Sequence, residues 1–367
     1  PRCNRSHACN YVSYMIDAET GFIKISRFAN KTYKEFMDGM EIIKDAGAKK
    51  VIIDLRQNPG GSLVAVLQMV DEFLGKGEPI LYTEGVNQAR KTYNASGSET
   101  WKDFKLYVMI DEFSASASEI FAGAMQDNDR GIIIGRRSFG KGLVQEQIPL
   151  SDGSALRLTV ARFYTPSGRC IQSSYEEGNE KYYDNIYARF HSMEQLVADS
   201  VHFADSLKYT TKSGRVVYGG GGIMPDFFVP IDTTGNSDYY NSIYRKGLIY
   251  TFAYAYADEH RKELTALTKA DEFDNYLDRK KVLEEFIKYA EGKGIQRDNA
   301  GLKTSSLIIQ TQLKAYIARN IIGEEGFYPI IKKIDNMLLR AIEISKQDLL
   351  VENLKGTNTI TDHTQPN

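Results

Sequence analysis

The strongest constraint on the fold of this chain is an alternation of short apolar runs with small-residue turns and helical patterns. Residues 51–55, 105–110 and 132–135 are apolar runs of the length expected for strands that are buried on both faces. Apolar-faced helical patterns over 63–74 and 119–126 lie between them, each preceded by a turn. Strand, turn, helix and strand at this spacing predict βαβ crossovers. We therefore expect an α/β fold built on a mostly parallel sheet.

The remainder of the chain divides into segments of different character. Residues 155–164 alternate and predict a long strand. From about Tyr239, helical patterns dominate, covering roughly residues 240–265, 270–292, 304–320 and 327–348. We expect four segments: an irregular leader over 1–11, an α/β core over 12–235, a helical domain over 236–352 and a polar tail over 353–367. The helical domain is interpreted as a packing or dimerisation module.

Composition and charge remove several classes of function. The formal net charge of −2 gives no electrostatic reason to expect a nucleic acid or an anionic membrane as partner. No apolar run is long enough to cross a bilayer, and the first ten residues lack the apolar stretch of a signal peptide. Cys3, Cys9 and Cys170 form neither a disulfide framework nor a zinc pattern. The five histidines are scattered along the sequence, at His7, His191, His202, His260 and His363. We therefore expect no metal ion and no other cofactor.

Two turns at the carboxyl ends of expected parallel strands carry the chemistry, because open α/β sheets bind their ligands at that edge. The first turn offers backbone amides at Gly60 and Gly61, where the lack of a side chain lets another backbone approach. The second turn offers the hydroxyls of Ser114, Ser116 and Ser118 at the start of a helix. A hydroxyl beside free amides at a helix start is the arrangement that acyl transfer requires.

A serine hydroxyl needs a base, and Lys141 is the candidate. It follows the third apolar run and is flanked by Gly140 and Gly142. A lysine acts as a base only in its neutral form, which apolar surroundings favour. Gln145 lies four residues later and could orient the amine without stabilising its charge as a carboxylate would.

Each of these motifs also has a plain structural interpretation. A Ser-Ala-Ser-Ala-Ser turn alone is most often a helix cap, and Gly-Lys-Gly or Pro-Gly-Gly alone is usually a loop or a turn. The loop that contains Lys141, residues 136–142, is called the lysine loop below. It is not a phosphate-binding loop, because Gly142 stands where that motif requires Ser or Thr. From the residues alone, it is the combination of the motifs, not any one of them, that favours a Ser-Lys hydrolase over these interpretations.

In combination, the motifs resemble the C-terminal processing peptidases, or tail-specific proteases, of serine peptidase family S41. The matching pieces cover about residues 12–230 in one order: 22–28 (FIKISRF), 54–61 (DLRQNPGG), 114–120 (SASASEI), 135–145 (GRRSFGKGLVQ), 164–172 (YTPSGRCIQ) and 219–226 (GGGGIMPD). The resemblance implies that Ser116 is the nucleophile, that Lys141 is the general base and that Gln145 orients the lysine. It also implies an oxyanion hole formed by the amide of Ala117 and by one of Gly60 or Gly61, and that choice stays open.

The family resemblance also implies the architecture. The core is expected to resemble the crotonase and Clp-protease superfamily, a twisted sheet with flanking helices, followed by an all-helical domain similar to the C-terminal extension of Bacteroidetes-type members. Family members usually carry a PDZ domain, which captures a substrate's C-terminal carboxylate, just ahead of the segment that begins near Val12. About ten residues precede Val12 in this sequence, so we expect either a truncated chain or a form without that domain.

The expected function is therefore that of a serine endopeptidase that cleaves near the C-termini of protein or peptide substrates through an acyl-enzyme. The resemblance implies a periplasmic or cell-envelope location, and a homodimer through the helical domain is a further expectation. As an alternative role, the helical domain could form a substrate-guiding wall over the cleft. One rival function is a catalytically silent binding or scaffolding protein on the same fold, and a second is an acyl-CoA hydratase or hydrolase.

Overall fold

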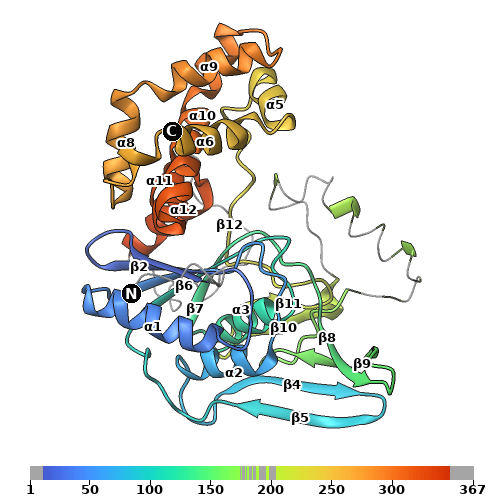
Figure 1. Ribbon diagram of the computed structural model, residues 1–367. Coiled ribbons are helices and arrows are strands. Elements are labelled where there is room, and N and C mark those ends of the chain that lie inside the picture. Colours follow the sequence, from blue (N-terminus) through green and yellow to red (C-terminus); the bar gives the residue numbers. More distant parts are fainter. Residues whose placement is uncertain are drawn as a thin grey trace. The chain divides into compact units, whose positions relative to one another are not determined.

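The computed structural model describes residues 11–173 and 204–347, together with positions 175, 178, 180, 181, 184, 187–189, 196 and 197. The described chain forms two compact units, one running to Pro230 and including the residues from Arg340, the other covering Ile231–Leu339 (Figure 1). Of the expected leader over 1–11 only Tyr11 is described, and the expected tail over 353–367 lies outside the described residues. Several cysteines and histidines lie outside them too: Cys3, Cys9, His7, His191, His202 and His363.

The first unit is built on a six-stranded sheet with the order β1-β2-β3-β6-β7-β12. Its strands are β1 (Tyr11–Met15), β2 (Thr20–Ile25), β3 (Lys50–Asp54), β6 (Lys105–Ile110), β7 (Gly131–Gly135) and β12 (Phe227–Phe228). All neighbours pair in parallel except β1, which is antiparallel to β2. Val51, Ile52 and Ile53 in β3 are fully buried, as expected for a strand covered on both faces. The predicted parallel sheet is confirmed.

Three helices connect the parallel strands and lie side by side on one face of this sheet (Figure 1). They are α1 (Thr32–Asp45), α2 (Leu63–Asp71) and α3 (Ala117–Asp127). Because β2, β3, β6 and β7 follow one another across the sheet in chain order, crossovers of one hand place every connecting helix on the same side. All the residues of α3 are buried, and Phe121 packs edge-on against Phe73. The expected twisted sheet with flanking helices is confirmed.

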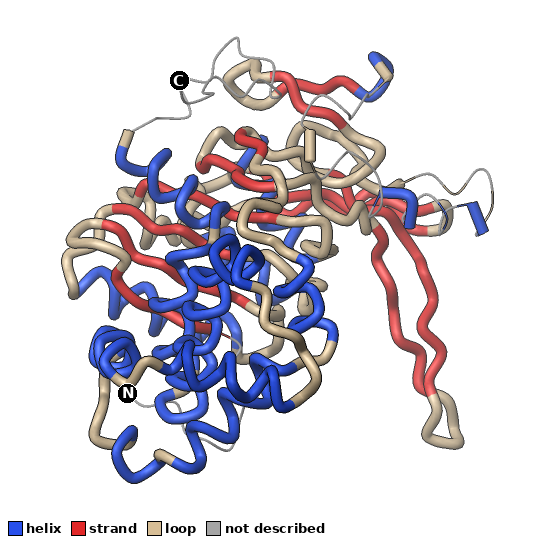
Figure 2. Tube along the Cα trace, turned by 90° about the horizontal axis from the view of Figure 1, so that it is seen from above, coloured by secondary structure: helices blue, strands red, loops and turns tan. Residues whose placement is uncertain are grey.

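A second, antiparallel sheet has the order β5-β4-β9-β8. Its strands are β4 (Pro79–Gly85), β5 (Gln88–Asn94), β8 (Leu143–Pro149) and β9 (Ala155–Tyr164), of which the sequence predicted only β9. The outer half of the β8–β9 hairpin is exposed on both faces and stands out from the body of the unit (Figure 2). A 3-10 turn (Asp205–Leu207) precedes a small hairpin formed by β10 (Lys208–Thr210) and β11 (Val216–Tyr218).

The second unit is helical, as the sequence predicted, but the predicted helices are interrupted. The elements are α5 (Asp238–Arg245), α6 (Leu248–Glu259), α7 (Arg261–Leu264), α8 (Ala270–Arg279), α9 (Val282–Gly292), α10 (Asn299–Ile322), α11 (Glu324–Ile331), a 3-10 turn (Lys332–Ile334) and α12 (Asn336–Lys346). The predicted helix over 240–265 is broken at Gly247, and the one over 270–292 at Lys281; both have left-handed backbones. None of the described helices is long and apolar enough to cross a membrane.

The two units divide near the predicted limit between residues 235 and 236, but the first unit also takes in the end of α12 from Arg340 onward. Lys50, at the start of β3, donates a hydrogen bond to the backbone carbonyl of Ser345 in that helix. The predicted domain limits, 12–235 and 236–352, stay predictions about which segments fold independently.

Buried charges fix the carboxyl-terminal end of α3, which lies away from the turn at residues 114–118, called the serine turn below. The carboxylate of Asp226, just before β12, accepts hydrogen bonds from Arg215 at 2.6 Å, from Gln126 at 2.9 Å and from the amide of Ile133 at 2.8 Å. Arg215 also pairs with Asp129 at 2.7 Å. Arg215 and Asp226 are almost completely buried, so each charge depends on the other for compensation.

Asp226→Asn should lower the free energy of unfolding by about 3 kcal/mol, because it leaves the Arg215 cation buried with one carboxylate fewer. Urea unfolding at pH 7 measures this. The matched control is Lys212→Ala, which removes an exposed ion pair with Glu78 and should change stability by less than about 1 kcal/mol. Equal costs for the two variants would contradict a structural role for the buried network.

Candidate active site

The two turns that the sequence singled out meet at the carboxyl edge of the main sheet. The backbone carbonyl of Asn58 accepts the amide of Ala115 at 3.0 Å and the hydroxyl of Ser118 at 3.0 Å. A methyl group on Gly60 would lie 2.7 Å from the Cβ of Ser116, closer than side chains pack, and the φ of Gly60 is 94°. Glycine is therefore required at this position, and the Pro-Gly-Gly turn packs directly against the serine turn.

Ser116 immediately precedes α3 and has an unusual backbone. Its φ of 56° and ψ of −111° place a non-glycine residue in the left-handed half of conformational space. Such a conformation costs roughly 1–3 kcal/mol and persists only when the surroundings enforce it, which occurs most often at functional sites. The side chain is half-buried, and it lies at the positive end of the α3 dipole.

The side chain of Glu119 holds the serine turn and the lysine loop together. It is fully buried in the first turn of α3. Its Oε2 accepts the amide of Ser116 at 2.8 Å and the amide of Lys141 at 2.9 Å. Its Oε1 accepts the amide of Gly140 at 2.7 Å and the hydroxyl of Ser138 at 2.6 Å. Burial raises the pKa of this carboxyl, whereas the four hydrogen bonds act in the opposite direction.

Glu119 is a residue to which the sequence analysis gave no role. The available signal was its position three residues after Ser116, where a Glu commonly returns to the amide of the residue that caps the helix. That half of the capping pattern is present. The further reach to the lysine loop depends on residues more than 20 positions away, which no local pattern indicates.

The structure brings the backbones of Ser116 and Lys141 together, although no hydrogen bond links their side chains among the described residues. Because both amides donate to the same oxygen of Glu119, the two nitrogens are within about 6 Å of each other. Lys141 is half-buried. Over the described residues, its ammonium group makes no hydrogen bond to the Ser116 hydroxyl.

Gln145 lies apart from this group. It is exposed in β8 and donates a long hydrogen bond of 3.5 Å to the hydroxyl of Thr159 in β9. The pairing of β8 with β9 shifts register between Val144 and Gln145, and such a bulge changes the direction in which the following side chains point. No hydrogen bond joins Gln145 to Lys141 in the part of the chain that the structure describes.

The backbone amides of Gly60, Gly61 and Ala117 differ in whether they already donate a hydrogen bond within the protein. The amide of Gly60 donates to the side-chain oxygen of Asn58 at 2.9 Å and is therefore occupied. Within residues 11–173 and 204–347, no acceptor is found for the amide of Gly61 or for that of Ala117. Gly61 is fixed by Phe28, whose backbone carbonyl would lie 2.0 Å from a methyl group at this position.

A buried ion cluster holds the backbone that leads into the Pro-Gly-Gly turn. Asp54 ends β3, is fully buried, and pairs with Arg56 at 2.7 Å and with Lys24 at 3.4 Å. Burial raises the pKa of the Asp54 carboxyl, but the charges of Arg56 and Lys24 outweigh this and lower the pKa to about 2. The backbone of Arg56 is thereby fixed two residues before Asn58.

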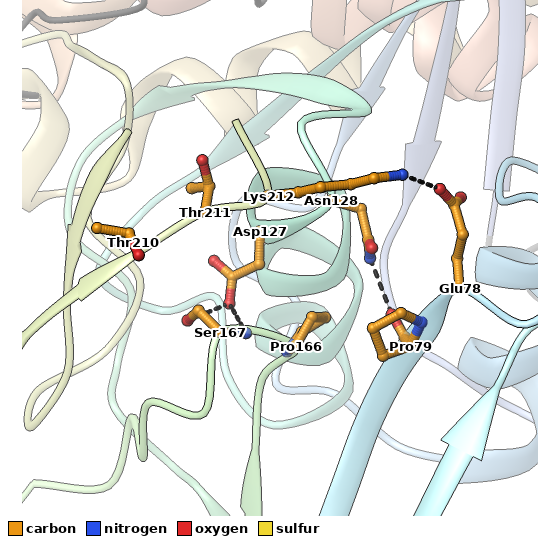
Figure 3. Close-up of a pocket in the computed structure, with 9 residues that line it drawn as sticks. All are labelled: Glu78, Pro79, Asp127, Asn128, Pro166, Ser167, Thr210, Thr211 and Lys212. Atoms are coloured by element: carbon orange, nitrogen blue, oxygen red, sulfur yellow. Dashed lines mark hydrogen bonds and ion pairs between the residues drawn. The ribbon is translucent and has the colours of Figure 1, made fainter. Parts of the chain in front are cut away.

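An open cavity of about 450 Å³ lies at the opposite end of α3 (Figure 3). It contains none of the predicted site residues; its lining is Glu78, Pro79, Asp127, Asn128, Pro166, Ser167, Thr210, Thr211 and Lys212. The length of α3 separates it from Ser116 by about 16 Å. Its charged groups are paired: Lys212 with Glu78, and Asp127 with Arg169. In the described ranges, no three His, Cys, Asp or Glu side chains are grouped as metal ligands.

Comparison with known proteins places these features in a family. Residues 19–178 match the model of peptidase family S41, and residues 239–323 match a family of unknown function, DUF8443. A carboxy-terminal-processing protease of Bartonella bacilliformis is 41% identical over 166 residues, or 44% of this chain. A carboxyl-terminal-processing protease of Synechocystis is 40% identical over 146 residues, or 40% of this chain. The S41-type motifs identified in the sequence at Ser116 and Lys141 thus lie in a segment that matches the peptidase S41 family.

The matched stretches cover 38% and 34% of these two relatives, so the chain spans well under half of their length. Among solved structures, a photosystem II D1 C-terminal processing protease is 28% identical. The match covers 46% of this chain and 47% of that protein, with a TM-score of 0.42.

Acid should weaken the support of the Pro-Gly-Gly turn. Because the pKa of Asp54 is lower in the folded than in the unfolded chain, its contribution to stability is present above the ordinary value and is lost as the pH falls toward about 2. Between pH 5 and pH 3, the parent should lose about 1 kcal/mol more unfolding free energy than Asp54→Asn does.

Urea unfolding at both pH values measures the difference. Asp38→Asn is the control, because that carboxylate forms only an exposed pair with Lys34, and its acid response should follow the parent. An Asp54→Asn variant with the same acid response as the parent would contradict the ionised, buried Asp54.

Proposed function

We propose that the S41 peptidase domain of this chain is a serine endopeptidase in which Ser116 is the nucleophile and Lys141 the general base. The observation that carries the proposal is the shared carboxylate of Glu119, which holds the amides of both residues at 2.8 and 2.9 Å. The strained backbone of Ser116 at the start of α3 supports it further. A structural cap would not require the lysine loop to be tied to the serine turn.

The reaction follows the logic of acyl transfer. The neutral amine of Lys141 accepts the proton of the Ser116 hydroxyl, whose oxygen forms a bond to the peptide carbonyl carbon. The tetrahedral intermediate collapses, the C–N bond breaks, and the Lys141 ammonium returns the proton to the leaving amine. Water then attacks the acyl-enzyme carbonyl as Lys141 takes a proton from it. When the second tetrahedral intermediate collapses, the C–O bond to Ser116 breaks and the Lys141 ammonium returns the proton to the Ser116 oxygen. The side chains must close by rotation when substrate binds, as catalytic contacts in ligand-free enzymes often do.

The oxyanion hole is proposed to consist of the amides of Ala117 and Gly61. An amide that already donates to an oxygen has little capacity for a second acceptor, which disfavours Gly60. The amides of Ala117 and Gly61 lie on the two turns that Asn58 holds together, so both can face a carbonyl attacked by Ser116. Gln145 is proposed to orient Lys141 after the side chain turns at the β8 bulge.

The substrates are proposed to be proteins or peptides that are cut near their C-termini. This part rests on the names of the relatives in Bartonella bacilliformis and Synechocystis. The segment that matches the S41 family model, residues 19–178, carries Ser116 and Lys141. A periplasmic or cell-envelope location and a homodimer through the helical unit belong to the same proposal. They follow from the family resemblance and from the helical composition of residues 236–352.

A catalytically silent binding protein is the second candidate. It is favoured by the exposed Gln145 and by the lack, among the described residues, of a hydrogen bond between the Ser116 and Lys141 side chains. A fluorophosphonate probe distinguishes the two candidates, because only a serine activated by a base reacts with it.

Ser116→Ala and Lys141→Ala should each reduce cleavage of unfolded casein at least about 1,000-fold, since nucleophile and base act as one unit. Circular dichroism and the melting temperature establish that the variants are folded. Ser154→Ala and Lys212→Ala, at exposed positions away from the site, should retain parent activity. Parent-level cleavage by either site variant would refute the assignment.

The choice of Gly61 is tested by a crystal structure of a phosphonate adduct on Ser116. The phosphonyl oxygen that mimics the oxyanion should lie within about 3.2 Å of the Ala117 and Gly61 nitrogens. The Gly60 amide should keep its bond to Asn58. An oxygen bound by Gly60 instead, with the Asn58 contact broken, would reverse the choice.

A further inference from the structure

Arg189 reaches into the lysine loop from outside the S41-matched segment, which ends at residue 178. Its guanidinium group donates to the backbone carbonyl of Phe139 at 2.9 Å, to that of Ser138 at 2.8 Å and to that of Arg137 at 3.4 Å. The side chain is half-buried. Three successive carbonyls that converge on one planar fork of donors form a specific contact, because a guanidinium presents its N–H groups in fixed directions.

The opposite side of the same loop is held by a negative charge. Glu119 accepts the amides of Gly140 and Lys141 and the hydroxyl of Ser138. The loop therefore lies between a buried carboxylate at its N–H groups and a guanidinium at its carbonyl groups, and both charges favour the observed direction of the peptide dipoles. Phe139, whose carbonyl Arg189 binds, is two residues before Lys141 and also donates its amide to Ser114 in the serine turn.

We propose that Arg189, which follows the S41-matched region, is a positioning residue that holds the lysine loop and thereby sets where the proposed base lies. This inference rests on the proposed function, because it assigns to Arg189 the placement of Lys141 relative to Ser116. Without the guanidinium, the three carbonyls must find water, and the carbonyl side of the loop can tilt while Glu119 still holds its amides beside the serine turn, which moves the Lys141 side chain relative to Ser116. A misplacement of about 1 Å is enough to reduce a chemical step about 100-fold.

The test compares Arg189→Ala, Arg189→Lys and a matched control, Arg130→Ala. Arg130 is also half-buried and also donates to several backbone carbonyls, those of Phe73, Trp101, Lys102 and Phe104. It lies just before β7, at the opposite edge of the sheet from the serine turn. The control therefore removes a similar structural contact without touching the lysine loop.

Steady-state cleavage of a fluorogenic peptide by each folded variant gives the outcome. Arg189→Ala should lower kcat about 10- to 100-fold with KM within about twofold of the parent. Guanidinium at low millimolar concentration should restore part of the lost kcat of Arg189→Ala, by occupying the vacated position. Arg189→Lys, which keeps the charge but not the fork, should fall between the parent and Arg189→Ala. Arg130→Ala should lose stability while the kcat of its folded fraction is retained and is unaffected by guanidinium.

Three results would overturn the inference: an unchanged kcat in Arg189→Ala, a loss confined to KM, or an equal loss of kcat in Arg130→Ala. Failure of the proposed function is recognised separately, because parent cleavage would then survive Ser116→Ala. If Arg189→Ala does not fold, the kcat of Arg189→Lys and the response of Arg189→Gln to guanidinium decide the question by the same criteria.

Discussion

The arrangement of the candidate site depends on one buried carboxylate. Glu119 has no contact with solvent, and burying an ionised carboxylate is costly unless donors compensate it. Four donors do so: the amides of Ser116, Gly140 and Lys141 and the hydroxyl of Ser138. Because these donors come from two segments, Glu119 can be satisfied only when the serine turn and the lysine loop are next to each other. The electrostatic requirement of one side chain thus specifies the relative position of the two proposed catalytic residues.

The sheet supplies the platform on which this contact forms. Parallel pairing brings the ends of β3 and β6 to one edge, so the turns that follow them are neighbours. Asn58 then joins the two turns, while the ion cluster of Asp54, Arg56 and Lys24 fixes the backbone that leads into the first turn. Gly60 permits the close approach because no side chain separates it from Ser116.

The lysine loop is held by groups from several parts of the chain. Glu119 belongs to α3 inside the S41-matched segment, whereas Arg189 lies beyond its end. Opposite charges on the two sides of the loop restrain it more strongly than either would alone, and they separate two roles. Glu119 ties the loop to the proposed nucleophile, and Arg189 contacts it from beyond the segment that matches the family model. Because the position of the lysine loop depends on both contacts, a change in the Arg189 contact can shift the loop while the Glu119 contact is kept.

The sequence by itself determined the apolar strands of the parallel sheet, the helical character of the second half and the motifs at Ser116 and Lys141. These properties are local, because the pattern of apolar and turn-forming residues at consecutive positions is enough to predict them. It did not indicate β4, β5 or β8; β5 consists mainly of exposed polar residues, and its pairing with β4 rather than its composition defines it. Only the tertiary structure decided that Glu119 bridges two segments, that Gly60 is occupied while Gly61 is available, that Gln145 is exposed and that Arg189 binds the lysine loop. Each of those facts is a hydrogen bond, or the lack of one, set by residues that become neighbours only on folding.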